Sequence, residues 1–327
     1  MTLILGIETS CDDTSIAVVN VAGHVLACKT ASQVEVHESY GGIYPEFASR
    51  AHVAAIIPTL EATLKDANIA PEDLAAIGVT RGPGLIGSLL VGIHTASGLG
   101  AGWGLPVYGV NHLRGHLRSA LLEGGTVHYP AIVLLASGGH TLIAHMKDAA
   151  SMELVGTTRD DSVGEAYDKV ARMLNLGFPG GPIIDKVAKT GEATTRFPRP
   201  MLGKGFEFSF SGLKSSVRRH LEQNPKAHVP DVAASFVAAC MDVLVSKCNA
   251  AIEQYKPASL IVVGGVSASP QLRAGMADLC AAKGVHLALP PQQWSTDNGA
   301  MIAMATFDYT GSEPELEVNP NLPIGVL

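Results

Sequence analysis

Short hydrophobic runs separated by polar turns recur along the chain and predict two similar β-hairpins. Residues 3–9 and 15–19 form the first pair of runs, joined by a Cys-Asp-Asp turn. Residues 131–135 and 141–146 form the second pair, joined by a Ser-Gly-Gly-His turn. Strand-length apolar runs bounded by turn residues are typical of hairpins. The pattern therefore predicts one hairpin near the start of each half of the chain.

A second feature also occurs twice: an apolar strand, a glycine-rich loop and an apolar helix. Residues 74–79 lead into Arg-Gly-Pro-Gly, and residues 259–263 lead into Gly-Gly-Val-Ser, after which Ser269 is the expected N-cap. The repetition predicts a duplicated α/β architecture with two lobes around a nucleotide cleft. Loop N–H groups at helix starts suit phosphate binding. Two unrelated glycine turns remain the alternative.

Between the repeats, the chain has the pattern of a mostly helical insert. Ser162 and Glu165 form a capping box ahead of an apolar helical stripe, and Lys169 follows Glu165 at a spacing that allows an ion pair. A rigid Phe-Pro-Gly-Gly-Pro loop then opens another helix, with Asp185 expected in its first turn. Residues 196–210 show no clear pattern.

Composition excludes several classes of protein. The five cysteines are odd in number and form no CxxC pair, which argues against a disulfide framework or a zinc knuckle and fits a reducing cytosol. The start of the chain lacks signal-peptide features. Residues 82–113 carry no Asp, Glu, Lys or Arg, but their nine glycines favour a strand, a loop and a buried helix over a membrane span. We expect a cytoplasmic protein with no membrane segment.

The formal net charge of −7 gives no global reason to expect a polyanionic partner. Residues 186–219 are locally different, with eight Lys or Arg against two Glu, a net +6. We call this segment the basic strip. It is either an ordinary solvated surface or a phosphate-binding strip.

The strongest candidate chemistry is a pair of histidines in the run Asn-His-Leu-Arg-Gly-His. If Asn111 caps a helix, His112 and His116 project from one face and can bind one metal ion. An HxxxH pair also occurs by chance. Leu113 stands where metalloproteases of the HExxH type have a glutamate base, which weakens a peptidase interpretation.

A third ligand must come from elsewhere, and Asp297 is the candidate. It directly precedes an apolar helix expected over residues 300–307, so an N-cap role is the plain alternative. Two histidines and one carboxylate would suit iron(II) or zinc and leave coordination positions open.

Nine ordered motifs together resemble the TsaD family, the tRNA adenosine threonylcarbamoyltransferases once misnamed O-sialoglycoprotein endopeptidases. The resemblance spans nearly the whole chain. The motifs are GIETSCDDT (6–14), TRGPGLIGSL (80–89), NHLRGH (111–116), SGGHT (137–141), DDSVGEAYDKVA (160–171), FPGGP (178–182), FSFSGLK (208–214), GGVSAS (264–269) and STDNGAMIA (295–303).

The resemblance implies a fold of the sugar kinase, heat-shock ATPase and actin type, in agreement with the duplication. We expect a first lobe over 1–130, with a C-terminal helix at about 298–327 packing back on it. The second lobe would span 131–297, with the helical insert at about 158–232.

The resemblance also implies the site residues. His112, His116 and Asp297 match metal ligands, with one divalent ion per chain and iron(II) expected ahead of zinc. The family usually has Asn where this chain has Ser269, which leaves one nucleotide contact open. The positions that match substrate contacts are Ala136, Ser137, Gly138, Gly139, His140, Asp168, Gly181, Asp185 and Ser269.

The implied reaction transfers threonylcarbamoyl from threonylcarbamoyl-adenylate to N6 of adenosine-37, in tRNAs that read codons starting with A, and releases AMP. Asp12 and Asp13 are weak candidates for a general base, with a turn role as the alternative. The implied partners are tRNA, the paralogous subunit TsaB and the small ATPase TsaE. A metallopeptidase and a non-catalytic nucleotide-binding scaffold of the same fold are the competing functions.

Overall fold

The computed structural model describes residues 2–38, 42–311 and 315–325. The described chain forms two compact units. Unit 1 comprises Met1–Thr126 with Pro290–Leu327, and unit 2 comprises Val127–Leu289. Residues 290–297, which the sequence interpretation assigned to the second lobe, belong to unit 1.

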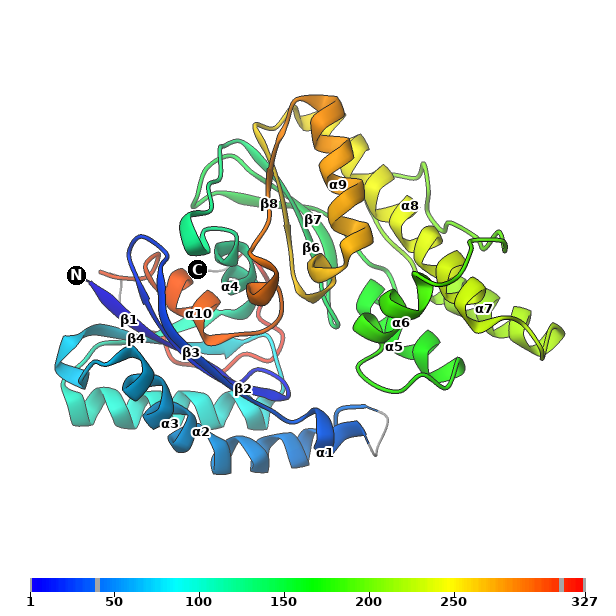
Figure 1. Cartoon of the computed structure of the whole chain (residues 1–327). Helices are drawn as coiled ribbons and strands as arrows, with labels where there is room; N and C mark the ends of the chain where they lie inside the picture. The colour runs from blue at the N-terminus through cyan, green and yellow to red at the C-terminus, as the bar shows by residue number, and fades with distance from the viewer. Residues whose placement is uncertain (1, 39–41, 312–314, 326–327) are drawn as a thin grey trace. The chain divides into compact units, whose positions relative to one another are not determined.

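Unit 1 is built on a mixed five-stranded sheet in the order β3-β2-β1-β4-β5 (Figure 1). The first three strands form an antiparallel meander, and β4 and β5 continue the sheet in parallel with β1. The first predicted hairpin is confirmed as β1 and β2. The strands are β1 (Leu3–Glu8), β2 (Asp13–Asn20), β3 (Val25–Ser32), β4 (Leu74–Gly82) and β5 (Val107–Asn111).

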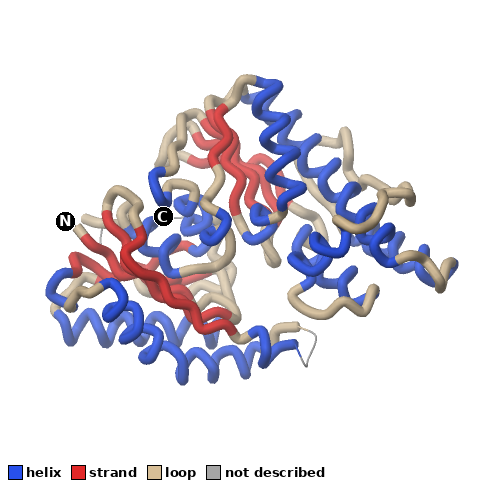
Figure 2. The backbone as a smooth tube through the Cα atoms, in the orientation of Figure 1, coloured by secondary structure: helices blue, strands red, loops and turns tan. Residues whose placement is uncertain are grey.

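Helices cover both faces of this sheet, because alternate side chains of a strand point to opposite faces (Figures 1 and 2). Leu5 and Ile7 pack with α2 and α3 on one face, whereas Ile4 packs with α10 on the other. A Cβ at Gly6 would lie 2.1 Å from the Gly299 carbonyl, so only glycine allows α10 to approach this closely. The helices are α1 (Val34–Glu38), α2 (Pro45–Ala67), α3 (Ile86–Trp103), α4 (His112–Ser119) and α10 (Gly299–Thr306).

Unit 2 repeats the topology of unit 1. Its sheet has the order β10-β9-β6-β7-β8, with an antiparallel meander followed by two parallel strands. The same connectivity occurs in unit 1, so the predicted duplication is confirmed. The strands are β6 (Ala131–Ala136), β7 (Thr141–Met146), β8 (Met152–Thr157), β9 (Ser259–Val263) and β10 (His286–Ala288).

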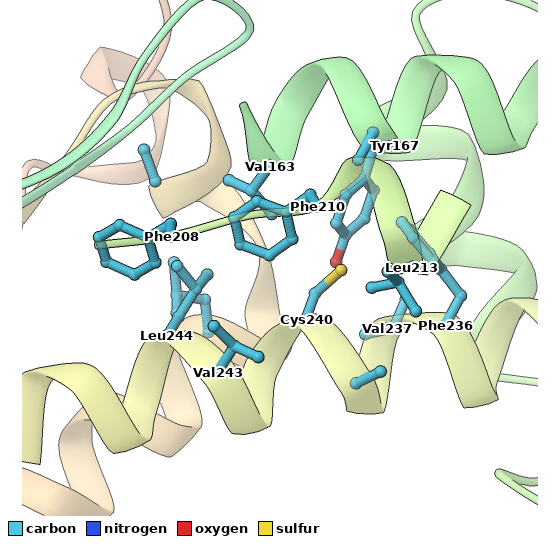
Figure 3. Close-up of a cluster of buried hydrophobic side chains, with 14 of the residues drawn as sticks. Val163, Tyr167, Phe208, Phe210, Leu213, Phe236, Val237, Cys240, Val243 and Leu244 are labelled. Atoms are coloured by element: carbon cyan, nitrogen blue, oxygen red, sulfur yellow. The ribbon is translucent and has the colours of Figure 1, made fainter. Parts of the chain in front are cut away.

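The core of unit 2 lies between the sheet and a helical layer. Figure 3 shows Tyr167, Phe208 and Phe210 packed beside α8, which contributes Phe236, and all four side chains are almost fully buried. By length and composition α8 could cross a membrane, but 56% of its most apolar window is buried in this core. The helices are α5 (Val163–Met173), α6 (Gly180–Ala188), α7 (Ser211–Gln223), α8 (Val229–Tyr255) and α9 (Pro270–Lys283).

Local sequence signals predicted some helix ends correctly and others incorrectly. The Ser162 cap is confirmed, because its hydroxyl accepts a hydrogen bond from the Glu165 N–H at 3.0 Å. The structure starts α6 at Gly180, so Asp185 lies in the second turn and not the first. The expected C-terminal helix is also shorter, because α10 ends at Thr306 and residues 315–325 form neither helix nor strand.

Candidate functional site

The two histidines lie at the start of α4, directly after β5. Asn111 caps this helix, as the sequence predicted: its side-chain oxygen accepts hydrogen bonds from the N–H groups of Leu113 at 2.9 Å and Arg114 at 3.4 Å. His112 and His116 are one turn apart, and their ring centroids are separated by 4.7 Å. The buried side chain of Leu113 occupies the position where HExxH peptidases have their glutamate base, so this helix has no carboxylate there.

Asp297 completes a three-residue cluster within unit 1. Its Oδ1 lies 3.1 Å from His116 Nε2 and 3.6 Å from His112 Nε2. The candidate ligand atoms of all three residues lie within 4.8 Å of one another. The alternative role of Asp297 as an N-cap is wrong, because Asn298 caps α10 through a 2.8 Å bond from the Met301 N–H. Asp297 lies one residue before this cap, with its carboxylate beside the two histidines.

Glu8 contacts the Nδ1 atom of His112, on the opposite side of the ring from Asp297. The sequence analysis did not identify this residue. Its carboxylate is 1% exposed and lies 3.0 Å from His112 Nδ1. It also accepts hydrogen bonds from the Thr80 hydroxyl at 2.6 Å and the Ser10 N–H at 2.5 Å. A carboxylate beside Nδ1 places the ring proton there and leaves the Nε2 lone pair for a metal. An acidic residue inside an otherwise apolar strand was the available signal.

The electrostatics of the cluster suit a divalent cation. Burial alone would lower the pKa of His112, but the carboxylates of Glu8 and Asp297 raise the pKa to about 9. His116 is fully buried, and within the described residues neither of its ring nitrogens makes a well-aligned hydrogen bond, although Asp297 Oδ1 lies 3.1 Å from Nε2. A buried polar atom without such a bond requires an explanation. A bound cation provides one, so the residues present fit a two-histidine, one-carboxylate metal centre.

The acidic tip of the β1–β2 hairpin carries Asp12 and Asp13. Burial is the main cause that raises the pKa of both carboxyls, and the pKa of Asp13 rises to about 6. A hydrogen bond with Ser32 opposes this rise in the pKa of Asp13, and the nearby carboxylates, including Asp297, contribute to it. Asp13 Oδ1 is buried and has no hydrogen-bond partner among the residues that the structure describes.

In unit 2, the turn between β6 and β7 exposes backbone. Ser137 closes the turn: its N–H donates to the His140 carbonyl at 2.8 Å, and its hydroxyl accepts from the His140 N–H at 3.1 Å. Ser162 donates to the Gly138 carbonyl at 2.5 Å and so fixes the tip. A Cβ at Gly138 or Gly139 would meet no atom within 4 Å. The two glycines therefore present an open backbone surface.

The other candidate substrate positions of unit 2 belong to two hydrogen-bonded groups. Asp168 accepts a 2.8 Å bond from the Gly180 N–H and so anchors the start of α6, beside the open position Gly181. Burial raises the pKa of Asp185, although a hydrogen bond with Ser269 partly offsets this. Asp185 Oδ1 is buried without a hydrogen-bond partner. Ser269, the departure from the family pattern, thus contacts another candidate residue.

The basic strip is partly neutralised by acids outside its own segment. Three of its eight cations form ion pairs: Arg199 with Asp242, Lys214 with Asp161 and Arg218 with Glu222. Lys186, Lys189, Arg196, Lys204 and Arg219 are exposed. Within the described part of the chain, none of these five has a carboxylate within 4.0 Å.

Comparison with known sequences relates the chain to one family. The sequence model of TsaD, described as tRNA N6-adenosine threonylcarbamoyltransferase, matches residues 24–304. A protein of that name from Staphylococcus haemolyticus is 46% identical over 325 residues, covering 97% of this chain and 95% of the relative. Another from Bacillus cereus is 45% identical over 332 residues, covering 98% and 95%.

Comparison with solved structures identifies the fold. HypF from T. kodakarensis matches with a TM-score of 0.63 at 13% identity, over 94% of this chain and 47% of that one. Component A of (R)-2-hydroxyglutaryl-CoA dehydratase from Acidaminococcus fermentans matches with a TM-score of 0.55 at 14% identity, over 93% and 97%. These likenesses confirm the duplicated actin-like fold expected from the sequence.

Proposed function

We propose a division of chemical roles between the two units of this chain, which belongs to the TsaD family of tRNA N6-adenosine threonylcarbamoyltransferases. The chain is a transferase that attaches a threonylcarbamoyl group to N6 of an adenosine in tRNA. Unit 1 contributes a metal centre, and unit 2 contributes the nucleotide-binding backbone. The His112–His116–Asp297 cluster is the observation that carries this proposal.

The metal ligands are His112, His116 and Asp297, with Glu8 orienting His112. A donor set of two histidines and one carboxylate is typical of iron(II) sites, so we propose iron(II) ahead of zinc. When bound, the ion supplies Lewis acidity that can orient a phosphate or polarise a carbonyl. Metal analysis of protein purified without added metal tests the choice.

The donor substrate is threonylcarbamoyl-adenylate, and its phosphate contacts the open backbone at Gly138, Gly139 and Gly181. In the proposed reaction the N6 amine of adenosine-37 attacks the carbamoyl carbon. The bond from that carbon to the phosphate oxygen breaks, AMP leaves and the amine loses a proton. Backbone N–H groups stabilise the charge that develops on the leaving phosphate. Recovery of equal amounts of AMP and modified tRNA tests this balance.

Asp13 is the better of the two base candidates at the hairpin tip. Its pKa of about 6 lies near the range where a carboxylate works as a general base. Its Oδ1, which has no hydrogen-bond partner, can accept the proton that the amine loses. Asp12 remains the second candidate.

The unpaired members of the basic strip are proposed to contact the tRNA backbone. Arg196→Ala and Lys204→Ala should each weaken tRNA binding and reduce the salt dependence of log K by about one unit of slope. Arg218 is the matched control, because it is also exposed but already paired with Glu222. Binding isotherms at several salt concentrations in the assembled complex measure both quantities. Wild-type affinity and slope for both variants would identify the strip as ordinary solvated surface.

The outer face of α2 and α3 is proposed to bind TsaB, the paralogous subunit, and TsaE would join this cytoplasmic assembly. Val53 and Ile57 lie one turn apart on α2, and Ile86 and Leu90 lie one turn apart on α3; all four are at least 39% exposed. The two helices pack on the same face of the sheet, and α3 contains no charged residue. On α2 the exposed charges Arg50 and Glu61 flank Val53 and Ile57. Exposed apolar side chains with charged residues around them are typical of protein interfaces.

Leu90→Asp should weaken TsaB binding by at least about tenfold, because the interface would have to bury an unpaired carboxylate. Leu154→Asp provides a matched control, since Leu154 is 52% exposed on the edge strand β8 of unit 2. Calorimetric titration with purified TsaB measures the effect. Equal affinities for both variants would place the interface elsewhere.

A further inference from the structure

Residues 315–325, which we call the C-terminal strap, pack against the ends of β4 and β5 in unit 1. We propose that the strap holds α4 in its metal-binding position through the side chain of Asn111. Asn111 thus acts as a positioning residue for His112. The proposal rests on the proposed metal centre and assigns part of its affinity to a distant segment of the chain.

Backbone hydrogen bonds attach the strap to the end of β4 and the loop that follows. The Asn319 N–H donates to the Arg81 carbonyl at 2.9 Å, and the Gly84 N–H donates to the Pro320 carbonyl at 3.1 Å. A Cβ at Gly82 would lie 1.9 Å from the Asn319 carbonyl oxygen. The chain therefore keeps glycine at this position so that the strap can lie against the sheet.

Side chains also hold the strap against unit 1. Arg81 is 3% exposed, and its Nη1 lies 3.0 Å from the Glu315 carboxylate. Leu322 and Ile324 are 4% and 5% exposed. A buried cation and two buried apolar side chains would all lose their partners if the strap left. The strap is thus a part of the core of unit 1.

Asn111 connects the strap to the metal helix. It is fully buried, stands at the end of β5 and directly precedes His112. Its Oδ1 caps the first turn of α4 by accepting from the Leu113 N–H at 2.9 Å, and its Nδ2 donates to the Pro323 carbonyl at 2.9 Å. The side-chain amide of Asn111 therefore forms hydrogen bonds with the first turn of α4 and with the strap at the same time.

This arrangement makes the position of His112 depend on the strap. Metal coordination tolerates errors of only about 0.2 Å in ligand distances. A small rotation of the first turn of α4 would move His112 away from Asp297, while His116, one turn further on, would move less. The strap should therefore affect metal affinity without contacting the metal.

Asn111→Asp separates the two roles of the amide, because aspartate is also a good helix cap but cannot donate to Pro323. Leu322→Ala loosens the strap without changing α4, and Asn321→Ala is the matched control at an exposed strap position. Zinc affinity is measured by competition with a chelator, and cobalt(II) absorption spectra report the geometry of the site. Thermal melting of each metal-free variant shows that it is folded at the assay temperature.

We expect Asn111→Asp and Leu322→Ala to weaken zinc binding by roughly 10- to 100-fold, as other outer-shell changes do, and to alter the cobalt spectrum. Asn321→Ala should behave as wild type. Wild-type affinity and spectra for both Asn111→Asp and Leu322→Ala would overturn the role of the strap while leaving the metal centre intact. Failure of the wild-type protein itself to bind either ion would instead overturn the metal centre and the inference with it.

Discussion

His116→Ala is expected to remove most of the metal bound by this protein without unfolding it, and His112→Ala should do the same. Each change deletes one of the three proposed ligands, and both histidines are buried. Elemental analysis of purified protein measures metal per chain. His286→Ala, which removes an exposed histidine of unit 2, is the matched control and should retain the metal.

Full metal content in the His112→Ala, His116→Ala double variant would show that the ion binds elsewhere. Glu8→Gln extends the same experiment to the supporting shell. Glutamine keeps the shape of the side chain but loses the charge that fixes the His112 tautomer, so we expect roughly 10- to 100-fold weaker metal binding. Unchanged affinity in Glu8→Gln would reduce Glu8 to a structural role.

Gly139→Val is expected to weaken adenylate binding by at least about tenfold, or about 1.4 kcal/mol, with little change in melting temperature. A Cβ at this position meets no atom within 4 Å, so the fold accepts the side chain. A bound phosphate near the Gly139 backbone would not accept it. Calorimetry with AMP tests the difference.

Gly212→Val is the control for this experiment, because Gly212 is also an open position of unit 2 but lies on α7. Unchanged AMP affinity in Gly139→Val would move the phosphate away from the β6–β7 turn. A loss of stability as large as the loss of affinity would also contradict the assignment.

The sequence predicted those parts of the fold that depend on local patterns. The two hairpins and the two strand–loop–helix units follow from apolar runs and glycine turns, and the order of the sheets confirms the duplication. Strand β3, which the patterns did not indicate, is an edge strand with mixed polarity, and only its pairing with β2 identifies it. The predicted end of the C-terminal helix was wrong. Contacts with residues far away in the sequence hold the segment after α10 in a non-helical conformation.

The candidate site likewise combines residues that local patterns could predict with residues that only the folded structure brings together. His112 and His116 could be paired from helical spacing alone. Asp297 could be named as a third candidate, but an N-cap role stayed open until the structure placed its carboxylate beside the two histidines. Glu8 was missed because its role exists only after β1 is placed beside α4. The net +6 of the basic strip counts only residues inside the segment, whereas acids outside it, such as Asp242, pair with three of its cations.

Nucleoside mass spectrometry of tRNA tests the transferase assignment and its metal centre most directly. The protein is incubated with unmodified tRNA, threonylcarbamoyl-adenylate, TsaB and TsaE, and the tRNA is then digested to nucleosides. We predict that threonylcarbamoyladenosine forms with the wild-type chain and falls to the level of the enzyme-free control with His116→Ala. No modified nucleoside with the wild-type chain, or equal amounts with His116→Ala, would contradict this account.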